Sequence, residues 1–197
     1  MKIYFAGPLF TPYVRKFISQ HAQILRDNGI DPFVPHESFK MDVPPSALED
    51  LVRRGLLKPE QLQNDSVNFL VQELVRAGRV RREDLGLPPV TPQTIFSVDY
   101  AGLSSANAVV ALLDGTQVDD GTACEIGIFY GLLRNDPTKK GIVGFMTDNR
   151  GIRKSERLWG LNLFTLGVIL ECGIIYSDFD QVLAKLKSWD AELRSGR

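Results

Sequence analysis

The chain has 197 residues, of which 44% are hydrophobic and 24% charged, so we expect one globular domain over residues 1–197 with a sizeable core. A formal net charge of -1 gives no electrostatic support for a nucleic-acid partner. The apolar stretches are too short for a signal sequence or a membrane span, and Cys124 and Cys172 are too few for a disulfide framework, so a cytoplasmic protein with buried free thiols is expected.

The first 35 residues follow a strand–helix–strand order. Residues 3–6 are short and apolar and end at Gly7-Pro8, which predicts a buried strand followed by a sharp turn. Residues 13–28 place apolar side chains at helical spacing, and Gly29 is a suitable stop. Residues 30–35 form a second short strand. This order favours a parallel sheet with a right-handed crossover.

Residues 41–90 interrupt that rhythm and are rich in Leu, Arg, Glu and Pro, which predicts a mainly helical insertion. They contain an internal echo, because Asp50-Leu51-Val52-Arg53-Arg54-Gly55 resembles Glu73-Leu74-Val75-Arg76-Ala77-Gly78. Two similar helix–turn units and a chance similarity of helix ends both explain it, and one echo is too little to establish a repeat architecture.

Alternation of strands and helices resumes after the insertion. The patterns predict a helix at 91–105, a strand at 108–113, a helix at 122–133, a strand at 141–146, an amphipathic stretch at 158–168, a strand at 173–176 and a helix at 178–193. The sequence therefore predicts an α/β fold: a flavodoxin-like or Rossmann-like three-layer sandwich with about five parallel strands and a helical insertion. Such sheets bind ligands beyond the carboxyl ends of the strands, where the strand order reverses.

Two loops are candidates for that position. Residues 6–10 follow the first strand and contain Gly7, Pro8 and Phe10, and residues 114–125 follow the strand after the insertion. With the strand order 2-1-3-4-5 these two strands are neighbours at the switch point. Both loops would then face one crevice.

The second loop is acidic and lacks Lys and Arg, which argues against a phosphate close to it. Its carboxylates are Asp114, Asp119, Asp120 and Glu125. Cleavage at the anomeric carbon of a sugar needs one carboxylate to stabilise or attack the cationic centre and another to move the leaving-group proton. Solvated turn residues and an oxygen-rich divalent-metal site are the alternatives, although the spacing is not that of an EF-hand.

Glu125 has a purely structural interpretation as well. Thr122-Ala123-Cys124-Glu125 fits a capping box with Thr122 at the N-cap and Glu125 at N3. The positive end of the helix dipole would favour an ionised Glu125, so a capping role and a nucleophilic role are compatible. Asp99 lies on the helix before the central strand and points either to solvent or to the crevice.

Four segments together resemble the nucleoside 2-deoxyribosyltransferase family. They are Ile3-Tyr4-Phe5-Ala6-Gly7-Pro8-Leu9-Phe10, Asp99, the run Asp119-Asp120-Gly121-Thr122-Ala123-Cys124-Glu125-Ile126-Gly127, and Gly160-Leu161-Asn162-Leu163. Each is weak alone, but their order within an α/β chain is fairly specific.

The resemblance implies an enzyme that moves 2-deoxyribose between nucleobases of 2'-deoxynucleosides with retention. Glu125 matches the nucleophile that forms a covalent deoxyribosyl-enzyme, and Asp99 and Asp119 match acids that contact the base and assist its protonation. Tyr4 matches a residue that holds the nucleophile. Asn162 matches a sugar contact from a neighbouring subunit, and Gly7, Pro8, Phe10 and Gly121 are placed at the substrate. A homo-oligomer with shared active sites, needing no metal or organic cofactor, is implied.

Three other functions share parts of this pattern. An N-glycosidase acting on deoxynucleoside monophosphates would release the sugar to water, but it should carry Ser and Arg in the first loop, where this chain has Gly7-Pro8-Leu9-Phe10. A cytokinin-activating phosphoribohydrolase would need a Pro-Gly-Gly-x-Gly-Thr run, which is missing. A non-catalytic nucleotide-binding module is disfavoured by the intact acidic residues.

Overall fold

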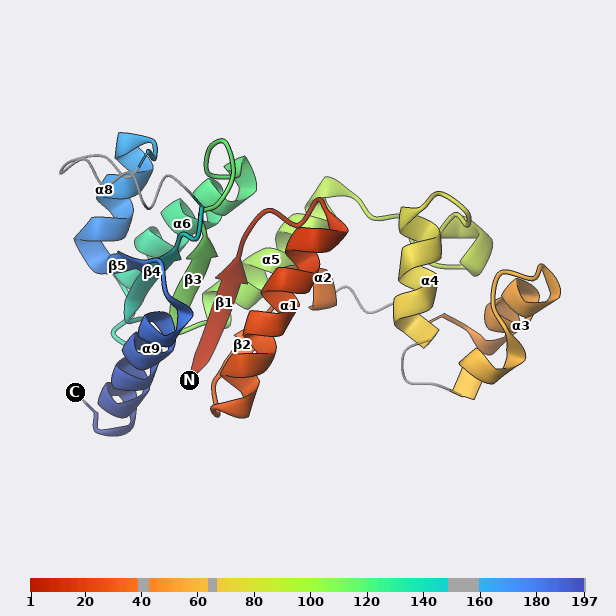
Figure 1. The fold of residues 1–197 in the computed structure, drawn as a ribbon, viewed down its shortest axis with the longest axis horizontal. Helices are drawn as coiled ribbons and strands as arrows, with labels where there is room; N and C mark the ends of the chain where they lie inside the picture. The colour runs from red at the N-terminus through yellow and green to blue at the C-terminus, as the bar shows by residue number, and fades with distance from the viewer. Residues whose placement is uncertain (39–42, 64–66, 149–159, 197) are drawn as a thin grey trace. The chain divides into compact units, whose positions relative to one another are not determined.

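The computed structural model describes residues 1–38, 43–63, 67–148 and 160–196, which form two compact units, Met1–Ser38 with Val98–Arg197 and Phe39–Ser97. The larger unit contains a five-stranded, all-parallel sheet in the order β2-β1-β3-β4-β5. Its strands are β1 (Lys2–Ala6), β2 (Asp31–Phe33), β3 (Ala108–Leu112), β4 (Gly141–Phe145) and β5 (Gly173–Tyr176). The predicted strand order is confirmed, and β1 and β3 are neighbours (Figure 1).

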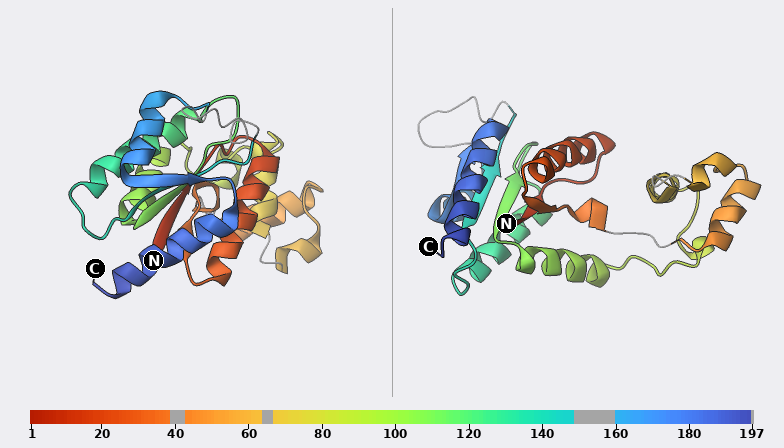
Figure 2. Two further views of the ribbon diagram at one scale, coloured as in Figure 1. Left: turned by 60° about the vertical axis from the view of Figure 1, so that its left-hand side comes forward. Right: turned by 90° about the horizontal axis from the view of Figure 1, so that it is seen from below.

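Helices cover both faces of the sheet, as predicted for a three-layer sandwich (Figures 1 and 2). On one face lie α1 (Pro12–Asp27) and α9 (Phe179–Arg194), and on the other lie α5 (Pro92–Ser105), α6 (Asp120–Leu133) and α8 (Leu163–Cys172). A short helix, α2 (Pro35–Ser38), follows β2. None of the described helices is both long and apolar enough to cross a bilayer.

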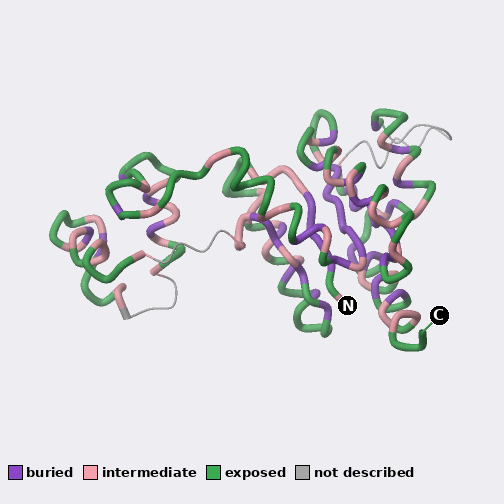
Figure 3. The backbone as a smooth tube through the Cα atoms, turned by 180° about the vertical axis from the view of Figure 1, so that it is seen from behind, coloured by how far each residue is buried: buried purple, intermediate pink, exposed green. Residues whose placement is uncertain are grey.

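The strands form the core, and β3 and β4 are buried along their whole length (Figure 3). Successive side chains of a strand point to opposite faces, so β1 contributes to two separate apolar clusters. Ile3 and Phe5 pack toward α1 and α9, whereas Tyr4 and Ala6 pack toward α5, α6 and α8. This alternation decides on which side of the sheet the Tyr4 hydroxyl lies.

The smaller unit is helical, as the insertion was predicted to be, and it repeats one motif. Its elements are α3 (Pro45–Arg53), the 3-10 helix η1 (Pro59–Gln63), α4 (Val67–Arg76) and the 3-10 helix η2 (Glu83–Leu85). In each copy a helix ends before a glycine in the left-handed conformation, Gly55 or Gly78, both with φ of 67°. The apolar residues Leu51 and Leu74 occupy equivalent places in one shared core. The two segments with similar sequences therefore have the same local structure, a helix closed by a left-handed glycine.

Some predicted boundaries differ from the structure. The strand expected over 30–35 ends at Phe33, because Pro35 begins α2. Positions 158 and 159 of the stretch at 158–168 lie outside the described residues, and the helix there, α8, continues to Cys172. Cys124 is exposed rather than buried, and Cys172 is partly buried; both are free. That the whole chain acts as a single domain stays a prediction.

Replacing Lys139 by Met should destabilise the larger unit by about 2 kcal/mol. The buried Lys139 ammonium donates to the carbonyl oxygens of Ser104 and Ala106, at 2.7 and 2.8 Å, and so ties the end of α5 to the start of β4. Met keeps the apolar stem but leaves both carbonyls without this donor. Denaturant unfolding measures the loss. Lys187→Met, at an exposed position, is the control and should change stability by less than about 0.5 kcal/mol. Equal effects of the two substitutions would contradict the assignment.

Candidate active site

A hydrogen bond between β1 and α6 lies at the centre of the site. The hydroxyl of the fully buried Tyr4 donates to Oε1 of Glu125 at 2.5 Å. Tyr4 reaches α6 because its side chain points to the α5, α6 and α8 face of the sheet, and Glu125 meets it from the second turn of α6. The sequence motifs at residues 3–10 and 119–127 are thereby joined through their side chains.

Burial raises the pKa of the Glu125 carboxyl from 4.5 to about 7. The hydrogen bond from Tyr4 opposes this shift, and the negative charges of Asp99 and Asp119 add to it. The dipole of α6 would favour the ionised form, but an exposed helix end contributes only about 0.3–1 kcal/mol. Desolvation therefore outweighs the dipole effect expected from the sequence. A carboxyl with this pKa is ionised in a large fraction of molecules at neutral pH and is poorly hydrated.

The capping box predicted for this helix is wrong. The N-cap of α6 is Asp119, whose Oδ2 accepts from the backbone N–H and the hydroxyl of Thr122 at 3.0 and 3.2 Å. Thr122 thus stands at N3, and Glu125 lies a turn too far along to reach the helix start. Gly121 leaves space for the cap, because a Cβ there would lie 3.1 Å from Oδ2 of Asp119. Glu125 is consequently free of a capping role.

Asp99 joins the same group of side chains. It lies on α5, and burial raises the pKa of its carboxyl to about 6. Its charge raises the pKa of both Tyr4 and Glu125, so it lies close to them. Its Oδ1 is buried and accepts no hydrogen bond from the residues that the structure describes. The structure thus places Asp99 near Tyr4 and Glu125, and Asp99 is not among the residues that line the cavity described next.

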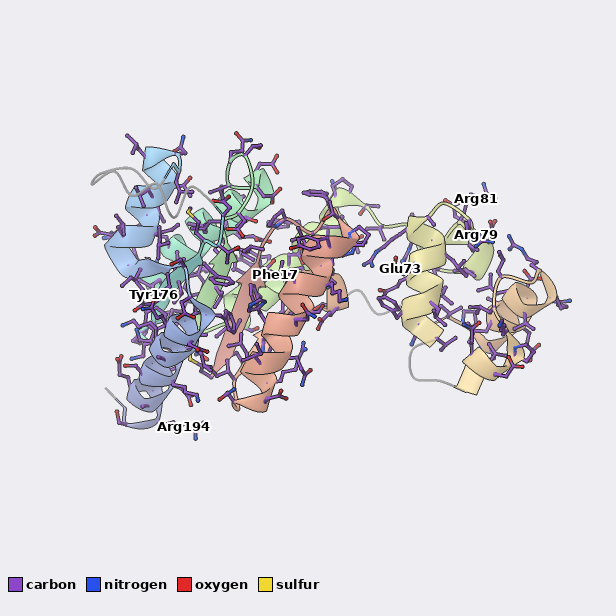
Figure 4. The ribbon with its side chains drawn as sticks, in the orientation of Figure 1. Phe17, Glu73, Arg79, Arg81, Tyr176 and Arg194 are labelled. Carbon is purple, nitrogen blue, oxygen red and sulfur yellow. The ribbon has the colours of Figure 1, made fainter. Side chains whose placement is uncertain are left out.

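A cavity of about 550 Å³ opens at the carboxyl ends of β1 and β3. Its polar wall comes from the loops after β3 and β4, and its apolar wall comes mainly from α1, including Phe17 (Figure 4). The lining residues are Pro8, Tyr13, Val14, Phe17, Leu112, Asp114, Gly115, Thr116, Gln117, Asp119, Asp120 and Thr147. Both predicted loops therefore face one cavity, and no Lys or Arg is among its described lining residues.

The cavity and the Tyr4–Glu125 pair lie toward opposite faces of the sheet. Leu112 and Phe17 pack toward α1 and α9, whereas Tyr4 packs toward α5 and α6. Asp119 belongs to both regions, since it lines the cavity and its charge raises the pKa of Glu125. The two regions meet at the start of α6.

Asp114 links the loop after β3 to the loop after β4 by hydrogen bonds, and so it is not simply a solvated turn residue. Its carboxylate accepts from the backbone N–H groups of Thr147 and Asp148, at 2.6 and 3.2 Å, and from the Thr147 hydroxyl. Asp148 in turn accepts from the N–H of Gly115 at 2.9 Å. The polar wall of the cavity is thereby held to the end of β4. Sequence reasoning missed this role because Thr147 and Asp148 lie in no motif; the only signal is an acid directly after a buried strand.

The remaining predicted site residues are more dispersed. Gly7 permits a close approach, because a Cβ there would lie 2.8 Å from the side chain of Ile18 and 3.2 Å from that of Leu112. Phe10 is 79% exposed and does not line the cavity. Asn162 is the N-cap of α8 and accepts from Phe164 and Thr165. The substrate contacts of these residues stay predictions. No cluster of three or more metal-ligating side chains occurs in the described part of the chain.

The chain matches a family model, and its fold is similar to that of a solved structure. The family model for nucleoside 2-deoxyribosyltransferase matches residues 3–186. A conserved protein from Enterococcus faecalis V583 has a similar solved structure, with 23% identity, a TM-score of 0.57 and coverage of 95% of this chain and 98% of that one. A 2-deoxyribosyltransferase from Bacillus psychrosaccharolyticus gives 20% identity, a TM-score of 0.48 and coverage of 93% and 90%. The chain matches no curated protein sequence.

Glu125→Gln should stabilise the protein at pH 8 by roughly 2 kcal/mol, a value reduced from the full pKa shift because the side chain is only partly buried. A carboxyl whose pKa is higher in the folded state contributes stability below pH 4.5, and this contribution is lost as the pH rises through about 7. The neutral amide avoids that loss and still accepts from Tyr4. Thermal unfolding at pH 8 and pH 4 measures the gain, which should vanish at pH 4. A gain equal at both pH values would contradict the assignment.

Proposed function

Because the chain belongs to the nucleoside 2-deoxyribosyltransferase family, we propose that it transfers the 2-deoxyribosyl group between nucleobases of 2'-deoxynucleosides. The observation that carries the proposal is the Tyr4–Glu125 hydrogen bond beside Asp99. It gives one carboxylate held in a fixed position and a second carboxyl within electrostatic range. Glycosyl transfer through a covalent intermediate requires these two groups.

In the first step, Glu125 attacks the anomeric carbon while the bond from that carbon to the base nitrogen breaks. Oε1 is engaged by the Tyr4 hydroxyl, which leaves Oε2 to form the new carbon–oxygen bond. The departing base takes a proton from a carboxylic acid as its bonding electrons move to the ring nitrogen. The product is a deoxyribosyl ester of Glu125 and a neutral free base.

In the second step, the incoming base attacks the same carbon and Glu125 leaves as a carboxylate. The incoming base loses its proton to the carboxylate that protonated the first one, so protons balance over the cycle. Two successive inversions give overall retention.

We assign that proton to Asp99 rather than Asp119. Asp119 is engaged as the N-cap of α6, where it accepts two hydrogen bonds from Thr122. Asp99 has a pKa raised to about 6 and a buried Oδ1 that accepts no hydrogen bond within the described residues. A carboxyl in such a setting exchanges a proton readily near neutral pH. Asp119 then serves to orient the base at the cavity.

Hydrolysis is the second candidate, since water in place of the incoming base would release free deoxyribose. The cavity favours transfer, because Tyr13, which is 79% exposed, offers aromatic surface for a planar base in the cavity that Asp119 also lines. The same cavity has no Lys or Arg among its described residues, which favours a nucleoside over a nucleotide.

The proposed enzyme is a homo-oligomer in which Asn162 acts in the site of a neighbouring copy. The support comes from α8, where Leu163, Phe164 and Leu170 are each more than half exposed. Exposed apolar side chains gathered on one helix are typical of an interaction surface. Asn162 caps this helix and would be carried to the partner with it.

The activity is tested by incubating the protein with a 2'-deoxynucleoside and a different free base, and separating the products by chromatography. A second deoxynucleoside should form, and Glu125→Ala should reduce its rate by at least about a thousandfold because the nucleophile is lost. Glu49→Ala, at an exposed position on α3, is the control and should keep the rate. Free deoxyribose as the only sugar product would favour the hydrolase, and near-normal exchange by Glu125→Ala would overturn the mechanism.

Shared sites are tested by mixing two inactive variants, Glu125→Ala and Asn162→Asp. Asp keeps the N-cap of α8 but removes the amide. In a mixed dimer one of the two sites would contain both native residues, so about a quarter of the wild-type exchange rate should return after subunits are exchanged. Continued inactivity in oligomers shown to be mixed would mean that each copy forms its own site.

A further inference from the structure

Tyr4 is held by an aromatic neighbour from the adjacent strand. Phe33, the last residue of β2, lies opposite Tyr4 in the parallel register. The two rings are stacked, with centroids 5.4 Å apart and planes inclined by 15°. The Tyr4 ring therefore cannot shift toward β2 unless Phe33 moves as well.

Phe33 is held in turn by helix α5. An added Cβ at Gly102 would lie 2.5–2.6 Å from three carbon atoms of the Phe33 ring, closer than real side chains come. Only glycine allows the backbone of α5 to lie directly against this ring. Gly102 is one helical turn after Asp99, so both are on the same side of α5.

This contact distinguishes Gly102 from three glycines farther inside helices α6 and α8. A Cβ at Gly127, Gly131 or Gly167 would have no atom within 4 Å outside the local backbone. Glycine inside a helix costs roughly 0.5–1 kcal/mol relative to alanine. At Gly102 the close approach of Phe33 explains why glycine is present despite that cost.

We infer that Phe33 and Gly102 are positioning residues that set the Tyr4 hydroxyl on Glu125 and fix how closely the helix bearing Asp99 approaches both. The connection runs from the backbone of α5 through the Phe33 ring and the Tyr4 ring to Oε1 of Glu125. Neither residue touches the reacting atoms. The inference rests on the proposed role of Glu125 as the nucleophile.

The consequence for catalysis follows from what the hydrogen bond does. Tyr4 fixes one oxygen of Glu125 and favours its ionised form. The other titratable groups whose charges act on this carboxyl are Asp99 on α5 and Asp119 at the start of α6, and both disfavour ionisation. If the Tyr4 ring is displaced, the hydrogen bond that lowers the pKa of Glu125 is lost, and Glu125 should titrate at a higher pH.

Gly102→Ala tests the inference by pushing on the Phe33 ring. The exchange kcat should fall about tenfold or more, as expected for loss of a hydrogen bond to a charged group, while KM stays within about twofold. The acid limb of the kcat–pH profile should move to higher pH. Gly131→Ala, at an uncrowded exposed position on α6, is the control and should leave both quantities unchanged.

A second substitution separates positioning from loss of stability. Phe33→Leu shortens the side chain, so the double variant Gly102→Ala with Phe33→Leu should recover part of the kcat lost by Gly102→Ala, which makes the effects non-additive. Additive losses, or an unmoved acid limb, would overturn the inference.

An NMR titration of the Glu125 carboxyl supplies a readout that does not need activity. The carboxyl signal of Glu125 is identified as the one that is missing from the spectrum of the Glu125→Gln variant. Its midpoint should rise in Gly102→Ala and return toward the wild-type value in the double variant. If wild-type protein shows no exchange, the proposed function fails while this titration still tests the positioning role. If exchange occurs but the midpoint stays fixed in Gly102→Ala, the positioning role fails alone.

Discussion

The removal of the Glu125 carboxylate from water, offset by one hydrogen bond from Tyr4, is the constraint on which the site depends. Each unit of pKa shift corresponds to about 1.4 kcal/mol between the two protonation states, so the shift of Glu125 represents a substantial cost to the ionised folded protein. The parallel sheet holds Tyr4 in place despite this cost, because β1 is paired with β2 on one side and with β3 on the other. The Tyr4 hydroxyl is thereby held at 2.5 Å from Oε1 of Glu125.

The carboxyls of the acidic loop after β3 differ in their hydrogen-bond partners. Asp114 accepts from the loop after β4, and Asp119 accepts from Thr122, so both are engaged with groups that need an acceptor. Glu125 accepts one bond from a side chain that itself belongs to the core. Asp114 and Asp119 fix the loop, and burial raises the pKa of the Glu125 carboxyl. Acids of similar appearance in the sequence thus have different hydrogen-bond partners in the structure.

The sequence predicted the larger unit well because its strands are short apolar runs, each followed by a turn or an amphipathic helix. It did not predict the start of α6, since Thr122 and Glu125 fit a capping box, whereas the structure has Asp119 at the N-cap. The choice depends on how the chain leaves β3, which is a property of the loop in three dimensions. The raised pKa of Glu125 could not be predicted either, because it depends on how far the folded chain buries this carboxyl. The stack of Phe33 on Tyr4 joins residues whose pairing follows only once strand order and register are known.

The repeat in the smaller unit shows the opposite case, in which a weak sequence pattern has a strong structural meaning. One copy, a short helix with a 3-10 turn, presents too little apolar surface to be stable alone. Leu51 of the first copy and Leu74 of the second enter the same core, so each copy covers the other. The left-handed glycines Gly55 and Gly78 end the helices at equivalent points, and the backbone of Leu51 and of Leu74 accepts the closing hydrogen bonds. The two described helices of this segment, α3 and α4, therefore share both the turn conformation at their ends and the buried leucine position.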